Sequence, residues 1–341
     1  MKAADGSIDE ECVMKWVAPI IAGAAMVVGT WAWAEQPAPL VLETKIPLGP
    51  VSGRIDHFAV DPGRQRLFVA ELGNNSVGVI DLKQQKVFRT IGGLKEPQGV
   101  AYVRASDMLY VANAGDGSVH LFQGESLSPV GHIELGEDAD NIRVDTRANK
   151  VFVGYGSGAL AVIDALSRQK TTDISLGAHP ESFQLDSNGR IYVNVPNAGQ
   201  IAVVDRAAGK QSTGWSFSDA RDNFAMALDE NECQVIVVFR KPARIAAFGS
   251  KDGQIVFKGE TCGDADDVFV DPKRHRLYVS CGAGLIDVLQ RRGTGYERVA
   301  QVPTAPGART SLFVPSTDRL YVGVRASSAE PASVWVFRPE P

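Results

Sequence analysis

Residues Leu109-Tyr110-Val111-Ala112 form a short run of apolar and aromatic side chains that recurs along the chain. Successive copies begin 42, 42, 40, 44, 42 and 43 residues apart. The copies are Leu67–Ala70, Leu109–Ala112, Val151–Gly154, Ile191–Asn194, Val235–Val238, Leu277–Ser280 and Leu320–Gly323. A fixed period of this length indicates seven repeated structural units.

Each unit has the composition of four short strands. In the first unit the strands are Phe58–Asp61, Leu67–Ala70, Val77–Asp81 and Val87–Ile91, separated by turn-forming Pro, Gly and Asn residues. They are rich in β-branched and aromatic residues, and no segment shows a sustained helical period. The pattern predicts an all-β fold, a seven-bladed β-propeller, with residues 35–341 as a single domain.

The seventh unit has only three strands, the third being Ser333–Phe337. Residues 40–49 have the pattern of a fourth strand. We expect residues 40–46 to pair with Ser333–Phe337 and to complete the last blade. This pairing closes the ring and leaves no exposed strand edge.

Units such as Pro97-Gln98-Gly99-Val100-Ala101-Tyr102 followed by Leu109–Asn113 carry a specific resemblance. They are similar to the YVTN-repeat, YncE-like family of bacterial extracytoplasmic β-propellers, over residues 38–338. The resemblance implies a seven-bladed fold. It implies little about chemistry, because propellers host enzymes, binding proteins and scaffolds alike.

Residues 1–34 have the pattern of a secretory signal peptide. Lys15 precedes the apolar run Trp16–Val28, and Ala32-Trp33-Ala34 is an A-x-A cleavage pattern. The acidic stretch before Lys15 favours Met14 as the true start. The alternative is an uncleaved N-terminal anchor. We expect a periplasmic or secreted protein with no membrane span in the mature chain.

The mature protein is mildly acidic. Removal of residues 1–34 takes away two lysines and four acidic residues, so the net charge changes from −5 to −3. General nucleic-acid binding needs a basic surface. We therefore expect no nucleic-acid partner, and we expect a monomer.

Polar residues recur where the chain enters the first strand of each unit. These first strands line the central channel of a propeller, so the loops that enter them share one face. Asp56, Gln98, Asp140 and Asp266 align across four units, and His57 is the only histidine on this ring. The candidate ligand-binding set is Asp56, His57, Gln98, Asp140, Asn141, Glu181, Asn223, Asp267 and Arg309. The alternative is a polar funnel filled with ordered water.

Some of these residues are also candidate metal ligands, because Ca²⁺ and Mg²⁺ prefer carboxylate and amide oxygens. The possible metal set is Asp56, His57, Asp140, Glu181 and Asp267. The residue types resemble the metal site of six-bladed lactonase-type hydrolases, in which a divalent ion polarises a lactone carbonyl. Arginines at the same loops would neutralise the carboxylates, which weakens the metal hypothesis.

One tight basic cluster lies in the loops that frame the same mouth. Arg240, Lys241 and Arg244 form a candidate site for a carboxylate or phosphate group. Solvated loop charge is the alternative.

Three cysteines follow residue 34. Cys262 enters the sixth unit and Cys281 ends that unit's second strand on the same face, so we expect a disulfide in an oxidising compartment. The alternative is two buried thiols. Cys233 lies in a turn on the opposite face, and we expect a reduced thiol there.

Two functions follow from these observations. We expect a non-catalytic binding or interaction propeller whose funnel takes an unknown small molecule or protein. The alternative is a metal-dependent hydrolase with a divalent cation in the funnel. A stoichiometric divalent metal would separate the two.

Overall fold

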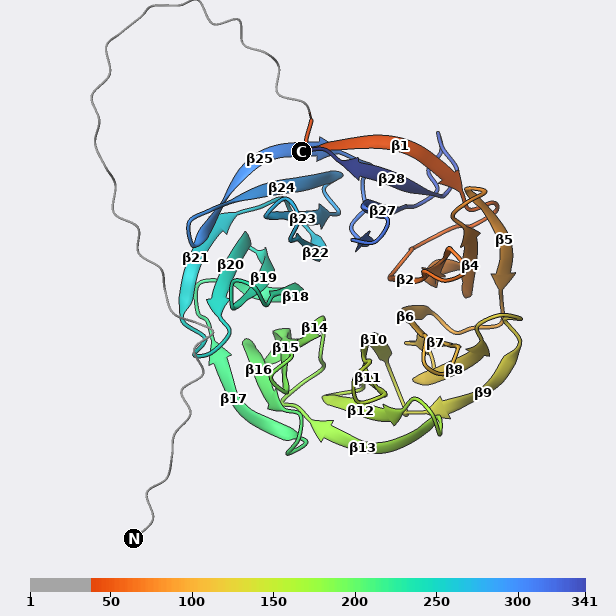
Figure 1. Ribbon diagram of the computed structural model, residues 1–341, viewed down its shortest axis with the longest axis horizontal. Helices are drawn as coiled ribbons and strands as arrows, with labels where there is room; N and C mark the ends of the chain where they lie inside the picture. The colour runs from red at the N-terminus through yellow and green to blue at the C-terminus, as the bar shows by residue number, and fades with distance from the viewer. Residues whose placement is uncertain (1–37) are drawn as a thin grey trace, which may run out of the picture. The chain divides into compact units, whose positions relative to one another are not determined.

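The computed structural model describes residues 38–341, so the predictions for residues 1–34, including the signal peptide and the start at Met14, lie outside the described residues. Residues Ala38–Pro341 form one compact unit. Seven four-stranded antiparallel sheets are arranged in a ring (Figure 1). The predicted seven-bladed β-propeller is therefore confirmed.

The first strand of each blade lies nearest the ring axis and the fourth lies outermost (Figure 1). We number the blades 1 to 7 in the order of their first strands. These are β2 (Phe58–Asp61), β6 (Pro97–Val103), β10 (Ala139–Asp145), β14 (Phe183–Leu185), β18 (Arg221–Asp229), β22 (Ala265–Asp271) and β26 (Ser311–Val314). The second strands are β3 (Arg66–Glu71), β7 (Met108–Asn113), β11 (Lys150–Tyr155), β15 (Arg190–Val195), β19 (Gln234–Lys241), β23 (Arg276–Cys281) and β27 (Arg319–Val324).

The third strands are β4 (Ser76–Asp81), β8 (Ser118–Gln123), β12 (Ala159–Asp164), β16 (Gln200–Asp205), β20 (Ala243–Gly249), β24 (Leu285–Arg292) and β28 (Ser333–Pro339). The outermost strands are β5 (Lys86–Ile91), β9 (Pro129–Glu134), β13 (Gln169–Ser175), β17 (Lys210–Ser216), β21 (Ile255–Glu260), β25 (Gly295–Pro303) and β1 (Leu40–Pro47). Two short 3₁₀ turns, η2 (Leu72–Asn74) and η3 (Pro196–Ala198), complete the described elements.

The middle strands of each blade are buried on both faces, because the neighbouring blades pack against them. All six residues of β7 are buried, whereas the outermost strand β9 of the same blade is almost entirely exposed. Burial on both faces explains why the repeat reads as a continuous apolar run and not as an alternating one.

The N-terminal strand closes the ring as predicted. β1 pairs with β28 in antiparallel register, from Leu40 opposite Pro339 to Pro47 opposite Ser333. Ile46 of β1 packs in one apolar cluster with residues of blades 1 and 7, and it is 1% exposed. The last blade is thus built from both ends of the described chain.

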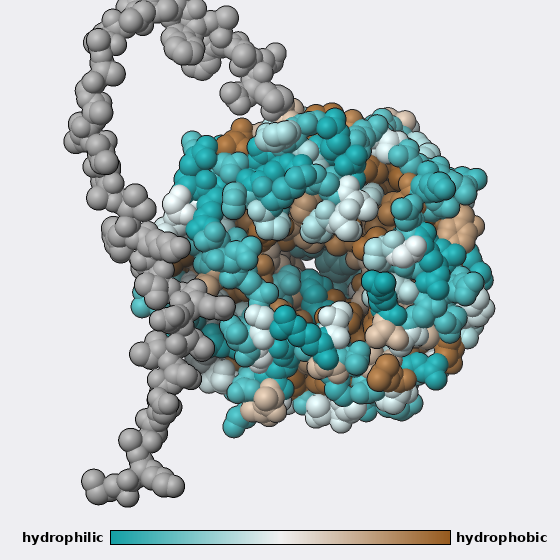
Figure 2. Space-filling view, viewed as in Figure 1, coloured by the Kyte–Doolittle hydropathy of each residue, from teal (hydrophilic) through white to brown (hydrophobic). Residues whose placement is uncertain are grey.

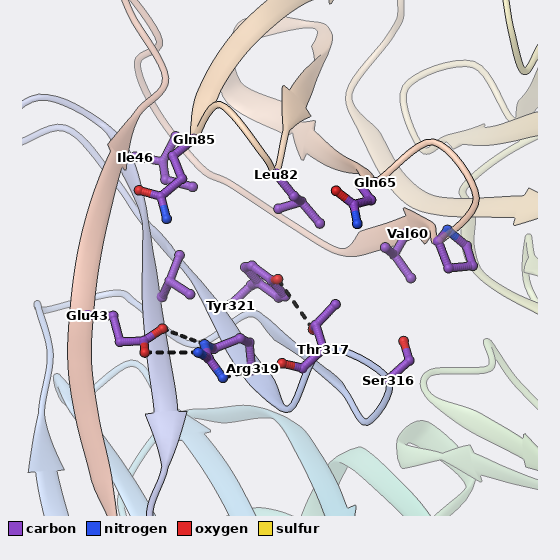
Figure 3. A pocket seen from close by; sticks show the side chains of 12 residues that line it. Glu43, Ile46, Val60, Gln65, Leu82, Gln85, Ser316, Thr317, Arg319 and Tyr321 are labelled. Atoms are coloured by element: carbon purple, nitrogen blue, oxygen red, sulfur yellow. Dashed lines mark hydrogen bonds and ion pairs between the residues drawn. The ribbon is translucent and has the colours of Figure 1, made fainter.

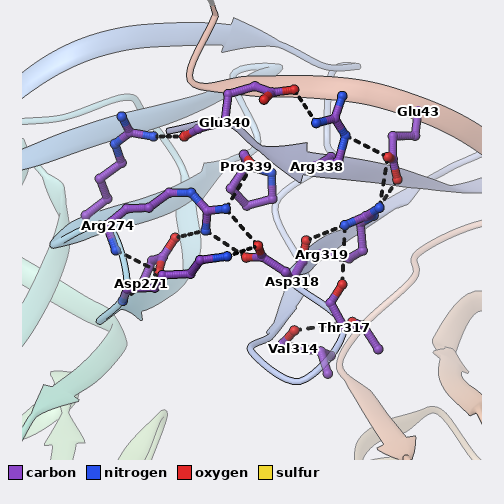
Figure 4. A network of polar contacts seen from close by, with 12 residues as sticks. Glu43, Asp271, Arg274, Val314, Thr317, Asp318, Arg319, Arg338, Pro339 and Glu340 are labelled. Carbon is purple, nitrogen blue, oxygen red and sulfur yellow. Dashed lines mark hydrogen bonds and ion pairs between the residues drawn. The ribbon is translucent and has the colours of Figure 1, made fainter.

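Charged clusters tie neighbouring blades together on the face opposite the entry loops. Arg274 of blade 6 donates to Asp271 in its own turn at 2.9 Å and to Asp318 of blade 7 at 2.7 Å (Figure 4). Arg64 bridges blades 1 and 2 in the same way, through Asp61 and Asp107. The repetition at equivalent positions marks these charges as structural links between blades.

The predicted disulfide between Cys262 and Cys281 is present, with the two Cα atoms 5.9 Å apart. Cys233 is also disulfide-bonded, so the prediction of a reduced thiol at this position is wrong. Its place on the opposite face excludes pairing with Cys262 or Cys281 but does not exclude another partner.

Within the part of the chain that the structure describes, no helix has the length and apolar character needed to cross a membrane.

Candidate functional site

One residue from each blade lines a cavity of about 270 Å³ at the mouth of the central channel, in the hollow that Figure 2 shows at the middle of the ring. Each of these residues lies where the entry loop meets the first strand. We call this set the upper ring: Asp56, Gln98, Asp140, Glu181, Phe224, Asp266 and Arg309. Rotational repetition of the blades places equivalent residues at the same depth in the channel.

Most of the predicted ligand-binding residues lie in this cavity. Six of the nine line it: Asp56, His57, Gln98, Asp140, Glu181 and Arg309. Asn141, Asn223 and Asp267 do not, although all three are buried. Each of these three is one residue beyond or before its upper-ring neighbour, so its side chain takes a different direction.

The prediction for blade 5 was wrong by one residue. A register irregularity in β18 between Asn223 and Ala225 places Phe224 in the upper ring. The Asn223 amide nitrogen instead donates to the Asn194 side-chain oxygen at 2.9 Å and to the Gln200 carbonyl at 3.1 Å. Asn223 therefore joins blades 4 and 5, and the bulge that moves it leaves no clear signal in the sequence.

Four further residues of the cavity were not in the predicted site sets: Arg54, Asp138, His179 and Asp266. Asp138 and His179 both line it, although only His57 among the histidines was expected there. The His179 Nδ1 atom lies 2.6 Å from the Gly156 carbonyl oxygen and 3.6 Å from a carboxylate oxygen of Asp138. These contacts hold the His179 ring at the rim.

The arginines of the cavity are already paired with carboxylates. Arg54 lies 2.7 Å from Asp56, and Arg309 lies 2.8 Å from Asp266. Arg240 also pairs with Asp266, and its guanidinium stacks on the Phe224 ring with 3.8 Å to the centroid. Their positive charges are therefore neutralised within the protein.

Two carboxylates of the upper ring have no such partner. Among residues 38–341, no donor forms a hydrogen bond or ion pair with the side chain of Asp140 or Glu181, and the Asp140 Oδ1 atom is buried without a partner. A buried acceptor without a donor is costly. Asp140 is thus a buried acceptor that an added donor would satisfy, and Glu181 is a half-buried acceptor beside it that no described donor contacts.

The pKa values of these acids follow from their surroundings. Burial, together with the charges of Asp140 and Asp266, raises the pKa of Glu181 to about 9. Burial also raises the pKa of Asp140, which His57 opposes. Burial raises the pKa of Asp56 to about 7, although His57 and Arg54 favour its ionised form. At neutral pH the cavity therefore holds protons that a cation would displace.

His57 forms the floor of the cavity. Its two ring nitrogens each lie 3.7 Å from a carboxylate oxygen, Nε2 from Asp56 and Nδ1 from Asp267. Burial lowers the pKa of His57, but the charges of Asp267, Asp56 and Asp140 outweigh it and raise the pKa to about 10. A second cavity, of about 400 Å³, lies along the channel on the other side of His57. Within the described chain, His57 is the one residue that lines both cavities.

The candidate metal set does not converge. Asp267 lies on the far side of His57 and accepts a hydrogen bond from the Ser311 amide, while Asp56 is paired with Arg54. Over residues 38–341, no three His, Cys, Asp or Glu side chains approach one another closely enough to hold a metal ion. The predicted set of five residues therefore does not come together as one group of metal ligands.

The basic cluster also separates. Arg240 turns into the cavity, whereas Lys241 pairs with Asp222 at 2.8 Å and Arg244 pairs with Asp219 at 3.5 Å. The three residues predicted as an anion site thus have separate acidic partners; Arg240 and Lys241 diverge because consecutive residues of a strand point to opposite faces.

A third cavity, of about 400 Å³, lies at the closure between blades 7 and 1 (Figure 3). Its charged residues are Glu43 and Arg319, which pair with each other. None of the predicted site residues lines it, and it leaves no charge without a partner.

Comparisons with known proteins support the fold. The chain is similar to a chain of Kuenenia stuttgartiensis hydrazine synthase, with a TM-score of 0.73 and 17% identity, covering 89% of this chain and 98% of the other. It is also similar to a chain in the crystal structure of a mitotic checkpoint complex, with a TM-score of 0.75 and 12% identity, covering 93% and 98%. At these identities the likeness shows the propeller fold alone. No protein-family model and no curated protein matches the chain.

Proposed function

We propose that this propeller is a binding protein whose upper ring takes a cationic group, an ammonium or a guanidinium, between Asp140 and Glu181. The observation that carries the proposal is the contrast within one cavity. Its arginines are paired with Asp56 and Asp266, whereas Asp140 and Glu181 lack a donor. A cationic donor would satisfy both acceptors at once.

The cavity favours a small ligand or a side chain of a larger partner. Its volume of about 270 Å³ is near the lower end of the range for small-molecule sites. The Phe224 ring, on which Arg240 stacks, is the one apolar side chain among the residues that line this cavity. A short alkyl chain that carries an amine would place its cation on the carboxylates and its methylenes against this ring.

Binding should release protons. Because the pKa of Glu181 is about 9 and that of Asp140 is raised, the free site holds protons at neutral pH. A bound cation favours the ionised carboxylates, so affinity should increase as the pH rises toward 9.

Titration calorimetry with butylammonium and butylguanidinium tests the proposal. We expect binding to the wild type, with a heat that changes between phosphate and Tris buffer because protons are released. Asp140→Asn and Glu181→Gln should each weaken binding about tenfold or more, the loss of a hydrogen bond to a charged group. Asp138→Asn is the matched control, because Asp138 lines the rim and is 51% exposed.

Butanol and butyrate serve as the neutral and anionic controls. If butyrate binds as well as butylammonium, or if both variants bind the amine like the wild type, the proposal fails. Binding without proton release would remove the role given to Glu181.

We propose further that the protein is extracytoplasmic and belongs with the YVTN-repeat propellers. The leader pattern before residue 35 supports export, and the Cys262–Cys281 disulfide suits an oxidising compartment. Fractionation of expressing cells, with N-terminal sequencing of the purified protein, tests this. Recovery from the cytoplasm with an intact leader would contradict it.

A further inference from the structure

A second ring of residues crosses the channel beneath His57. Each member lies three positions after an upper-ring residue and pairs with the aromatic or apolar residue at the second place of the repeat, as Arg143 does with Phe152. We call this set the lower ring: Ala59, Ala101, Arg143, Gln184, Ala227, Phe269 and Leu312. All seven line a cavity of about 400 Å³.

Arg143 is the one charged residue in a ring of five apolar residues and one glutamine. Its equivalents in the other blades are alanines, a phenylalanine, a leucine and one glutamine. Blade 3 lies across the channel from blades 6 and 7, as the positions of β10 and β22 show in Figure 1. The guanidinium therefore belongs to one side of the channel, and Phe269 and Leu312 form the apolar side that faces it.

Arg143 is in none of the described ion pairs, although the charges of Asp267 and Asp140 act on its guanidinium. Its two terminal nitrogens donate to the Ile142 carbonyl at 2.9 Å and to the Ser182 hydroxyl at 3.2 Å, and its guanidinium lies 5.6 Å from the centre of the Phe183 ring. Among the described ion pairs, none involves Arg143, in contrast to Arg54, Arg240 and Arg309 of the upper cavity. An arginine has five N–H donors, so donors remain for a ligand.

The other two charged residues of this cavity, Asp267 and His57, lie next to each other. Asp267 accepts the Ser311 amide at 2.8 Å and lies 3.7 Å from His57 Nδ1. Below the ring, Val60, Leu228 and Val270 continue an apolar lining. The lower cavity thus offers one guanidinium outside the described ion pairs, together with apolar residues of the first strands.

We infer that the lower ring binds the carboxylate of an amphipathic monocarboxylic acid, with its head on Arg143 and its alkyl chain along the apolar side of the channel. The planar fork of a guanidinium matches a carboxylate. The volume suits a medium-length chain, because small-molecule sites commonly span 300–1,000 Å³. This site lies on the far side of His57 from Asp140 and Glu181, so the inference does not rest on the proposed function.

Titration calorimetry with octanoate tests this inference, with 1-octanol and acetate as controls for the charge and the chain. We expect octanoate to bind more tightly than either control. Arg143→Gln should weaken octanoate binding roughly tenfold to hundredfold, and Arg143→Lys should recover part of the loss because it keeps the charge. Butylammonium binding at the upper ring should survive in Arg143→Gln and be lost in Asp140→Asn, so each proposal can fail alone.

A second variant serves if Arg143→Gln does not fold. Val270→Phe narrows the apolar side and should weaken octanoate binding while it leaves the weak binding of acetate unchanged. The inference is overturned if octanoate does not bind at millimolar concentration, if octanol binds equally well, or if the folded variants bind octanoate like the wild type.

Discussion

The two rings of the central channel are built by the same strands but have opposite chemistry. The upper ring has four acids, one arginine, one glutamine and one phenylalanine, whereas the lower ring has five apolar residues, one glutamine and one arginine. Only two residues lie between the members of the two rings in each blade. The fold therefore fixes where a side chain meets the channel, and the residue at that place decides what the channel can hold.

The rings also differ in how their charges are satisfied. Around the upper ring Arg54, Arg240 and Arg309 are paired with carboxylates, whereas the side chains of Asp140 and Glu181 accept no hydrogen bond from residues 38–341. Beside the lower ring Asp267 accepts a hydrogen bond and lies near His57, whereas Arg143 is in none of the described ion pairs. His57 lies between them, held by a carboxylate from each side. One channel thus presents an acceptor site above and a donor site below.

Removal of the closing strand β1 should destabilise the whole propeller, and with it both rings. This is the largest loss of stability that we expect. A chain that begins at residue 50 lacks β1, which leaves the edge of β28 unpaired and Ile46 absent from the core between blades 7 and 1. Compared with a chain that begins at Ala38, it should lose several kcal/mol in urea unfolding. Equal unfolding midpoints for the two chains would show that β1 does not hold the ring closed.

Replacement of Arg240 by alanine should cost much more stability than replacement of its neighbour Lys241, because only Arg240 lines the upper cavity. Arg240→Ala leaves the partly buried Asp266 with Arg309 as its remaining partner, and should cost about 3 kcal/mol. Lys241→Ala removes an ion pair of a lysine side chain that is 64% exposed, and should cost less than about 0.5 kcal/mol. Equilibrium unfolding of both variants makes the comparison, and similar losses would contradict the different placement of the two side chains.

The pH dependence of stability should distinguish the upper ring from the rest of the surface. The pKa of Glu181 is about 9 in the folded protein and about 4.5 when unfolded, so its ionisation opposes folding as the pH rises between these values. Glu181→Gln should remove this loss and stabilise the protein at pH 9 by roughly 1–3 kcal/mol relative to wild type. The exposed Glu137→Gln is the control. Parallel pH profiles for wild type and Glu181→Gln would show that Glu181 is not destabilised when ionised.

Much of the architecture was predictable because it depends on periodic patterns. The repeat of about 42 residues gave the seven blades, and the missing fourth strand gave the pairing of β1 with β28. The alignment of Asp56, Gln98, Asp140 and Asp266 correctly placed four members of the upper ring. Equal positions in a repeat become equal positions around an axis, so these inferences need no side-chain geometry.

The predictions for Asn223 and for the basic cluster missed the observed positions for a different reason. Phe224 replaced Asn223 because a bulge in β18 shifts the register by one residue, and a one-residue shift turns a side chain to another direction. Arg240 left the cluster with Lys241 and Arg244 because neighbouring residues of β19 and β20 face different ways. Local bulges and strand faces are set by packing, which the order of residue types does not record.

The sequence by itself determined the number of blades, their strands, the closing pair and the disulfide between Cys262 and Cys281, because each depends on spacing along the chain. Only the tertiary structure decided which charges are paired. The separation of Asp267 from the upper cavity, the lack of donors to Asp140 and Glu181, and the lack of an ion pair at Arg143 all depend on distances between side chains of different blades. Electrostatic interactions fall off over a few ångströms and depend on burial, so residues far apart in sequence set them only once the ring has closed.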